Sequence, residues 1–202
     1  MQYKNILPVA ILFIVITCFA MHKKLNNNTR SKTWVVSQNS SLSVNGSTNI
    51  NKFSCVIPAY DHTDTITISK KDEGYILTGD IALSISSFDC HNSGMTRQLQ
   101  KTLNEKQFPL LHIRFLSLNQ LPEPIAKPEF ITGLVAIEIA GVAKHFEIKY
   151  QISQDDQKVI HLLGSRDLNF SDFNLTPPQK LGGMIKTKDQ LTVAFNLNMK
   201  SL

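Results

Sequence analysis

Apolar and polar residues alternate along most of the chain from Thr33 onward, and this period of two is typical of β-strands with one buried face. The clearest case is residues 190–200, where every odd-numbered position from 191 to 199 is apolar and most even-numbered positions are polar. The same alternation occurs in residues 41–55, 65–69, 81–85, 111–115, 135–139, 146–152 and 159–163. We therefore expect about eight strands.

The pairing of these strands is expected to be antiparallel. Strands of a parallel sheet covered by helices are apolar on both faces, whereas these strands each have one polar face. The connections at residues 71–74 and 140–144 are short enough for hairpins, and Gly74 and Gly141 can adopt the positive φ that tight turns require. The sequence thus indicates an all-β domain built from an antiparallel sheet.

The apolar face changes side at residues 50–53, 85–88 and 115–116, because the apolar positions switch between even and odd numbers there. Such switches predict bulges or sharp bends. A sheet that closes on itself needs strong curvature and obtains it from bulges, whereas a flat sandwich strand seldom needs them. We favour a closed barrel, with a β-sandwich as the alternative.

One segment has the period of a helix instead. Met95, Leu99 and Leu103 recur every four residues with polar residues between them, which predicts a short amphipathic helix over residues 95–104. Pro109 prevents the helix from resuming. The helix could plug the core or lie over an open end of the barrel as a lid, and both can hold.

The first 24 residues are expected to be a signal peptide or an N-terminal membrane anchor. Residues 6–21 are mostly apolar and uncharged, but the run is short for a membrane span, which usually needs ~20 residues. Cleavage near Ala20, lipidation of Cys18 and retention as an uncleaved anchor remain open, and each exports the domain. Residues 25–32, which contain three asparagines, a threonine and a serine, are expected to form a flexible linker, and residues 33–202 one domain.

The two remaining cysteines, Cys55 and Cys90, form an even pair in an exported domain, where disulfides persist. A bridge between them would close a loop of about 36 residues, worth roughly 3.8 kcal/mol in the loop-entropy relation. Free thiols and a metal site that includes His91 are the alternatives. The metal site lacks further ligands at a recognisable spacing, so we expect the disulfide and no metal.

Neither catalysis nor nucleic-acid binding is indicated by the remaining residues. The chain contains no HExxH, GxSxG, P-loop or GxGxxG motif. Asp89 and Asp172 could form an acid–base pair, but no spacing brings them together, and capping of turns is the commoner role of such aspartates. The net charge of +5 is scattered, and its lysine doublets lack the aromatic or glycine-rich context of nucleic-acid motifs. We expect no enzyme, no cofactor and no nucleic-acid partner.

Four segments, in order, resemble those of the YceI-like, polyisoprenoid-binding family. The first is Trp34 followed by SLSVNGSTNINKFSC, and the second is DCHNSGMTRQLQKTLNEKQFPLLHIRF at residues 89–115. The third and fourth are GLVAIEIAGVAKHFEIKY at residues 133–150 and LNFSDFNLTPP at residues 168–178. The resemblance extends from about residue 33 to the C-terminus. It implies a lipocalin-like antiparallel barrel with an inserted helix, and it implies that the barrel holds an isoprenoid chain inside.

With this resemblance, the sequence predicts an exported, non-catalytic protein that holds an isoprenoid or similar amphiphile in its barrel. It would be periplasmic or anchored to the outer face of a bacterial membrane through residues 1–24. The alternative is a filled barrel that serves as a structural or protein-interaction module. The candidate ligand-binding residues, from the barrel lining and the helix lid, are Phe53, Met95, Leu99, Leu103, Phe115, Phe146, Tyr150 and Phe195.

Overall fold

The fold was analysed in a computed structural model that describes residues 31–60, 62–71, 74–121 and 127–202. The expected leader, residues 1–24, and most of the expected linker lie outside these described residues. Strand β1 begins at Ser31, so the last two residues of the expected linker already pair with the sheet. Among the described residues, no helix is both long enough and apolar enough to cross a lipid bilayer.

A single ten-stranded antiparallel sheet makes up most of the described chain. Its strands are β1 (Ser31–Val36), β2 (Ser41–Ser47), β3 (Lys52–Ile57), β4 (Thr65–Lys71), β5 (Gly74–Ser84), β6 (Leu110–Leu118), β7 (Glu129–Ile139), β8 (Val142–Gln154), β9 (Val159–Asn169) and β12 (Gln190–Ser201). A separate ribbon consists of β10 (Gln179–Lys180) and β11 (Ile185–Lys186). The helical elements are α2 (Ser93–Thr102), η1 (Ile85–Ser87), η2 (Phe170–Phe173) and η3 (Leu181–Gly183).

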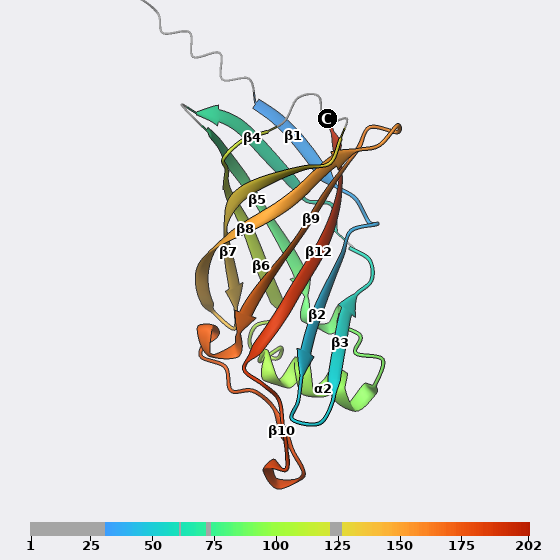
Figure 1. Cartoon of the computed structure of the whole chain (residues 1–202), viewed down its shortest axis with the longest axis vertical. Helices are drawn as coiled ribbons and strands as arrows, with labels where there is room; N and C mark the ends of the chain where they lie inside the picture. Colours follow the sequence, from blue (N-terminus) through green and yellow to red (C-terminus); the bar gives the residue numbers. More distant parts are fainter. Residues whose placement is uncertain (1–30, 61, 72–73, 122–126) are drawn as a thin grey trace, which may run out of the picture.

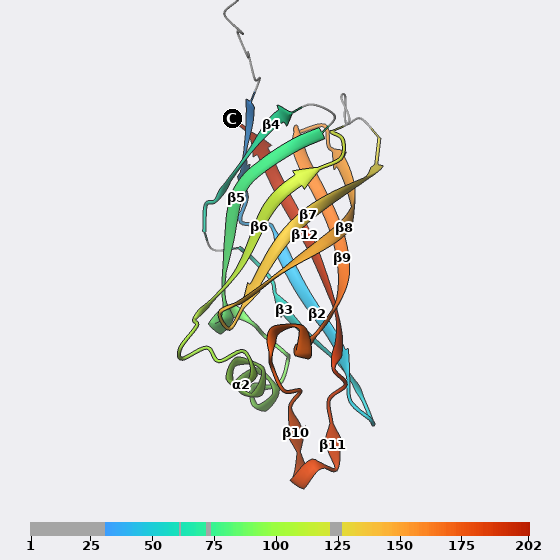
Figure 2. The same cartoon turned by 90° about the vertical axis from the view of Figure 1, so that its left-hand side faces the viewer.

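The sheet closes into an eight-stranded barrel, which confirms the expected fold. The strand order β1-β4-β5-β6-β7-β8-β9-β12 returns to its start, because β12 also pairs with β1. Figures 1 and 2 show the strands wrapping around a common axis. Strand β12 pairs with β1 along one end, where Met199 faces Val36, and with β2 along the other, where Thr192 faces Asn45. The β2–β3 hairpin therefore extends the wall beyond the eight-stranded ring.

The predicted face changes have three different causes. At residues 50–53 the prediction of a bend within one strand was wrong: β2 and β3 are two strands of a hairpin, with Val44 opposite Cys55. At residues 85–88 the chain leaves the sheet through the 3₁₀ turn η1. Of the three places, only Phe115 has a bulge, where the β6–β7 register shifts before Ser117. A parity change alone does not distinguish a reversal of the chain from a bulge, because both reset the alternation.

Helix α2 forms close to its predicted position. The Asn92 side chain accepts a hydrogen bond from the Met95 amide at 3.0 Å, and this N-cap starts the helix at Ser93, two residues earlier than expected. Asn104 has a φ of 56°, which fits the left-handed conformation that ends helices.

Among the hairpins, the β7–β8 turn is formed by Ala140 and Gly141, both at positive φ.

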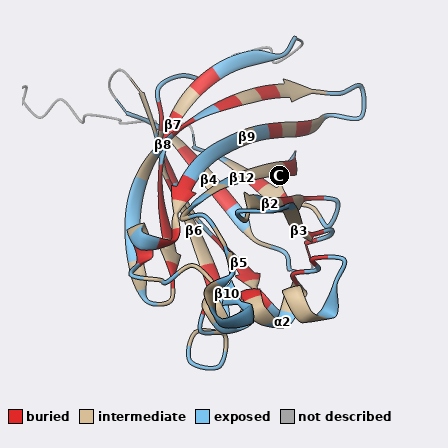
Figure 3. Ribbon diagram, turned by 60° about the horizontal axis from the view of Figure 1, so that its bottom comes forward, coloured by how far each residue is buried: buried red, intermediate tan, exposed pale blue. Residues whose placement is uncertain are grey.

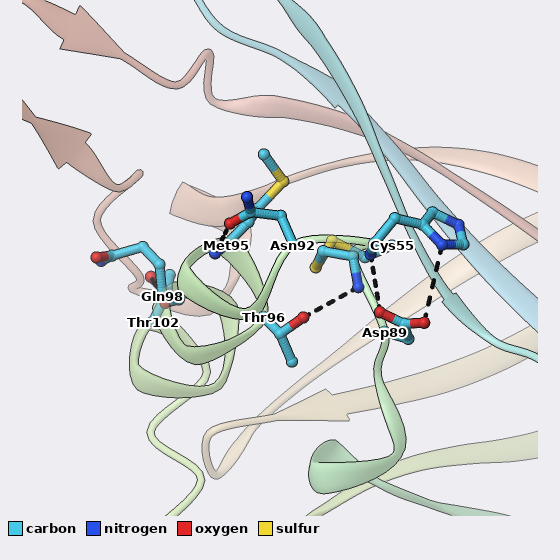
Figure 4. The surroundings of a disulfide bond; sticks show 9 residues. Cys55, Asp89, Asn92, Met95, Thr96, Gln98 and Thr102 are labelled. Carbon is cyan, nitrogen blue, oxygen red and sulfur yellow. Dashed lines mark hydrogen bonds and ion pairs between the residues drawn. A yellow bond between two sulfur atoms is a disulfide. The ribbon is translucent and has the colours of Figure 1, made fainter.

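A disulfide joins β3 to the segment that precedes α2, as Figure 4 shows. Cys55 and Cys90 are bonded, and both are buried. The Cys90 amide donates to Thr96 Oγ1 at 3.1 Å, so the bridge is tied to the first turn of the helix. The predicted disulfide is confirmed, and the free-thiol and metal-site alternatives for this pair are excluded.

Candidate functional site

The interior of the barrel is lined by apolar side chains, because alternate residues of each strand face inward. Figure 3 shows buried and more exposed bands alternating along β7 and β9. Between the walls lies a cavity of about 40 Å³, which we call the interior cavity. Its lining includes Ile81, Ile113, Val135, Ile148, Tyr150 and Phe195. One water needs about 10–15 Å³ of such cavity volume, so the interior cavity has room for roughly three water-sized groups.

Two further spaces lie next to the interior cavity, toward the helix. The helix-side cavity, of about 60 Å³, shares Leu42, Ile137 and Val193 with the interior cavity and is lined also by Leu99 of α2. The basal groove, of about 180 Å³, lies between α2, the β2–β3 hairpin and the β10–β11 ribbon. It shares Leu99 with the helix-side cavity. The three spaces therefore form a series along the inside of the molecule.

Glycines in the wall let two aromatic rings approach the strands closely. An added Cβ at Gly164 would lie 2.4 Å from Phe195 Cζ, so this ring covers the Gly164 backbone on the neighbouring strand. An added Cβ at Gly133 would lie 2.9 Å from Tyr150 Cε2. The rings of Tyr150 and Phe195 are 5.6 Å apart. Rings that rest on glycine take up less of the lumen than rings held away by a side chain.

The barrel wall is incomplete between β8 and β9. These strands pair only from Tyr150 opposite Gly164 to Gln154 opposite Ile160, although β8 begins at Val142 and β9 continues to Asn169. Figure 1 shows the two strands diverging from their common turn. The 3₁₀ turn η2 contacts the separated parts of both strands. Interior side chains are therefore not closed off by a continuous hydrogen-bonded ladder on this side.

Arg166 lies where the interior cavity meets solvent. It is on the part of β9 that does not pair with β8, it lines the cavity, and it is exposed. Its guanidinium is 5.9 Å from the centre of the Phe146 ring, a cation–π contact, and Val193 faces it on β12. No carboxylate contacts it among the described residues. A cation at the mouth of an apolar cavity can pair with the anionic end of an elongated molecule.

The hydroxyl of Tyr150 is a second polar group of the cavity lining that a ligand could contact. Tyr150 is fully buried, and its Oη has no hydrogen-bond partner among the described residues. Burial raises the pKa of this phenol above its usual range, so it stays protonated and can donate. An unpaired buried hydroxyl costs free energy, which a polar group of a bound molecule would recover.

The structure places the predicted site residues in different parts of this series. Phe115, Tyr150 and Phe195 line the interior cavity, Leu99 and Leu103 line the helix-side cavity, and Phe53, Met95 and Leu99 line the basal groove. Phe146 instead packs against Phe173 of η2, with ring centres 6.1 Å apart. The assignment of all eight to ligand binding stays a prediction.

The sequence analysis missed Arg166, because the predicted strand stopped at Leu163. The parity of Ile160 and Leu162 continues through Gly164 to Leu168, and it places Arg166 on the inward face. Following the alternation past the glycine would have found this residue.

The two aspartates considered for catalysis have structural roles. Asp172 accepts a hydrogen bond from the Asn169 amide at 2.8 Å and caps η2, and Asp89 accepts from the His91 amide at 2.8 Å. These contacts match the capping role that was the expected alternative. Within the described residues, no three His, Cys, Asp or Glu side chains gather where they could hold a metal ion.

Comparison with known proteins supports the fold assignment. No protein-family model and no curated protein matches the chain. A polyisoprenoid-binding domain from Saccharophagus degradans, implicated in plant cell wall breakdown, matches with a TM-score of 0.63 at 8% identity, over 84% of this chain and 98% of that one. BcnA of Burkholderia cenocepacia matches with a TM-score of 0.55 at 13% identity, over 83% and 95% of the two chains.

A YceI protein of Campylobacter jejuni matches with a TM-score of 0.50 at 15% identity, over 66% of this chain and 78% of that one. At these identities the likeness concerns the arrangement of strands and helix. It confirms the barrel fold with an inserted helix that the resemblance implied. The chain has the barrel fold of the YceI-like proteins.

Proposed function

We propose that this protein is an exported, non-catalytic carrier that holds the apolar chain of an isoprenoid or similar amphiphile inside its barrel. The observation that carries the proposal is the series of apolar cavities, which reaches solvent at Arg166. Each CH₂ group of a chain gains ~0.8 kcal/mol when it leaves water for such a lining. The name of the Saccharophagus degradans domain, which shares the fold, supports a polyisoprenoid as the class of ligand.

The volumes of the cavities set a condition on this function. An isoprenoid chain is larger than the interior cavity of about 40 Å³, so its entry requires the lining side chains to move apart. The rings of Tyr150 and Phe195, which lie next to wall glycines, are candidates for this movement. The same small volume favours a second function, a filled barrel that serves as a structural or protein-interaction module, which binds no lipid.

Two polar groups define the headgroup that fits best. Arg166 offers a cation at the opening between β8 and β9, and Tyr150 offers a hydrogen-bond donor in the interior. A ligand with an apolar chain and a phosphate or carboxylate end would satisfy the guanidinium. Hydrogen bonds to charged groups contribute about 1.5–3 kcal/mol, so this end should add roughly tenfold or more to the affinity.

Export is supported by the disulfide and by the expected leader. Cys55 and Cys90 are bonded, and such bonds persist in the periplasm and outside the cell but are rare in the cytosol. The disulfide supports export whether or not the protein binds a lipid.

The test is lipid extraction and native mass spectrometry of the purified protein, followed by titration with farnesol and farnesyl phosphate. A co-purifying apolar molecule, or binding of either probe at micromolar concentration, is the expected result. Arg166→Gln should weaken the binding of farnesyl phosphate much more than the binding of farnesol. The control Lys149→Gln, on the outer face of β8, should change the affinity for neither probe. A protein that carries no lipid and binds neither probe would be the filled barrel of the second function.

A further inference from the structure

The end of the molecule farthest from Ser31 carries three exposed apolar side chains. Ile50, in the β2–β3 turn, is 60% exposed, and Leu181 and Met184, in the turn between β10 and β11, are 66% and 69% exposed. Figures 1 and 2 show both turns projecting from the same end of the barrel. We call this surface, residues 47–52 and 179–188, the basal tip.

The two turns of the basal tip are held together as one unit. Asn49 Nδ2 donates to the Met184 carbonyl at 2.9 Å, and Asn49 Oδ1 accepts from the Lys186 amide at 3.0 Å. The Lys188 amide donates to the Ser47 carbonyl at 2.8 Å. The apolar side chains are therefore presented by a braced surface and not by two independent loops.

Positive charge surrounds these apolar side chains. The basal tip contains Lys52, Lys180, Lys186 and Lys188, all exposed, and neither of its two segments contains an aspartate or glutamate. The first acidic residue after it, Asp189, accepts hydrogen bonds from Ser171. The combination of exposed apolar groups and unopposed lysines is what an anionic lipid surface attracts, because the apolar groups enter the acyl boundary while the ammonium groups remain among the headgroups.

We propose that the basal tip docks onto an anionic lipid surface. A partner protein would bury an apolar patch of this kind equally well, but the ring of lysines without carboxylates favours a surface of uniform negative charge. The basal groove opens behind the tip, since Ile50 and Lys180 line it. Docking would thus place the membrane next to the basal groove, which borders the helix-side cavity.

The docking of the tip goes beyond the proposed carrier function, and the two can fail separately. Leu181 and Met184 line none of the three spaces, so their replacement tests docking without touching the lining. Lipid carriage is measured by extraction, as above, and docking by a probe on the tip.

The experiment uses tryptophan fluorescence of the full chain, whose one native tryptophan, Trp34, is buried. Leu181→Trp puts a reporter on the tip. Phe130→Trp puts one beside Lys149 at a site that is 62% exposed, near the start of β7, and Figure 1 shows β7 starting near the opposite end of the barrel. With phosphatidylcholine vesicles that contain phosphatidylglycerol, Leu181→Trp emission should shift to the blue and be quenched by lipids brominated on their acyl chains. Phe130→Trp emission should not change.

A reporter on the tip responds only to contact at the tip, so the result holds even if residues 1–24 also bind the vesicles. Replacing Lys186 or Lys188 by Gln in the Leu181→Trp protein should lower the vesicle affinity about fivefold per lysine. Lys71→Gln, at the other end, should leave this affinity unchanged. The proposal is overturned if Leu181→Trp emission stays unshifted on anionic vesicles, or if the two reporters are quenched equally.

Discussion

The substitution Gly164→Ala tests whether the resting position of the Phe195 ring determines the room inside the barrel. The new methyl group would lie 2.4 Å from Phe195 Cζ, whereas ordinary contacts begin near 3.4 Å. The ring must therefore move by about 1 Å, and since the wall lies behind the methyl group, it moves toward the interior cavity. The backbone at Gly164 does not require glycine for its conformation, because its φ is not among the positive ones.

The magnitude follows from the space that the ring occupies. Overpacking of this kind costs about 1–3 kcal/mol of folding stability, so the variant should still fold. If the displaced ring excludes two methylene groups of the ligand at ~0.8 kcal/mol each, the affinity for a prenol falls roughly 15-fold.

Isothermal titration with farnesol measures this loss, and Phe195→Leu supplies the matched control. The smaller side chain removes the clash, so the double variant Gly164→Ala/Phe195→Leu should bind more tightly than Gly164→Ala alone. Equal affinity of Gly164→Ala and the unmodified protein would refute the reasoning, as would a double variant that binds no better than the single one.

Two further predictions concern stability. Replacing both Cys55 and Cys90 by serine should lower the free energy of unfolding by roughly 3.8 kcal/mol in denaturant titration, because the unfolded chain regains the entropy of an open loop of about 36 residues; an unchanged midpoint would contradict this. The hydrogen bond from the Val159 amide lowers the pKa of Asp155, so the carboxylate stabilises the folded state above its ordinary pKa and loses this effect as the pH falls through the lowered value. Asp155→Asn should accordingly be less stable than the unmodified protein at neutral pH in thermal melts and equal to it in strong acid, and a pH-independent difference would count against the assignment.

Alternation sufficed to predict an antiparallel sheet because each wall strand keeps one buried face. Strand β12 shows why. Its odd-numbered positions from Leu191 to Met199 are all apolar and lie on one face, and the strand pairs with β9, β2 and β1. The choice of a closed barrel over a sandwich rested on the face changes, of which only the one at Phe115 is a bulge. The β2–β3 hairpin was misread because Thr48 to Asn51 contain no strong turn signal, and Gly46 lies within a strand instead of in the turn. Gly46 is there to make room for the Phe53 ring, which is a packing requirement that sequence spacing does not reveal.

The site could be predicted only in outline. Inward-facing residues such as Phe115 and Tyr150 follow from parity, but a filled core and a lined cavity share the same pattern. The separation of β8 from β9 depends on where η2 packs, through Phe146 and Phe173, and this long-range contact has no local signature. The exposure of Arg166 depends in turn on that separation.

The segment that follows η1 also covers part of the exposed edge of the sheet. Strand β3 ends the ten-stranded order, and an exposed edge strand invites pairing with another copy of the chain. Val56 and Asp89 exchange two backbone hydrogen bonds at 2.8 Å near the C-terminal end of that edge, and the adjacent Cys55–Cys90 bond fixes the segment there covalently. An incoming strand could not extend along β3 without breaking this cover, so the disulfide should guard against aggregation as well as against unfolding.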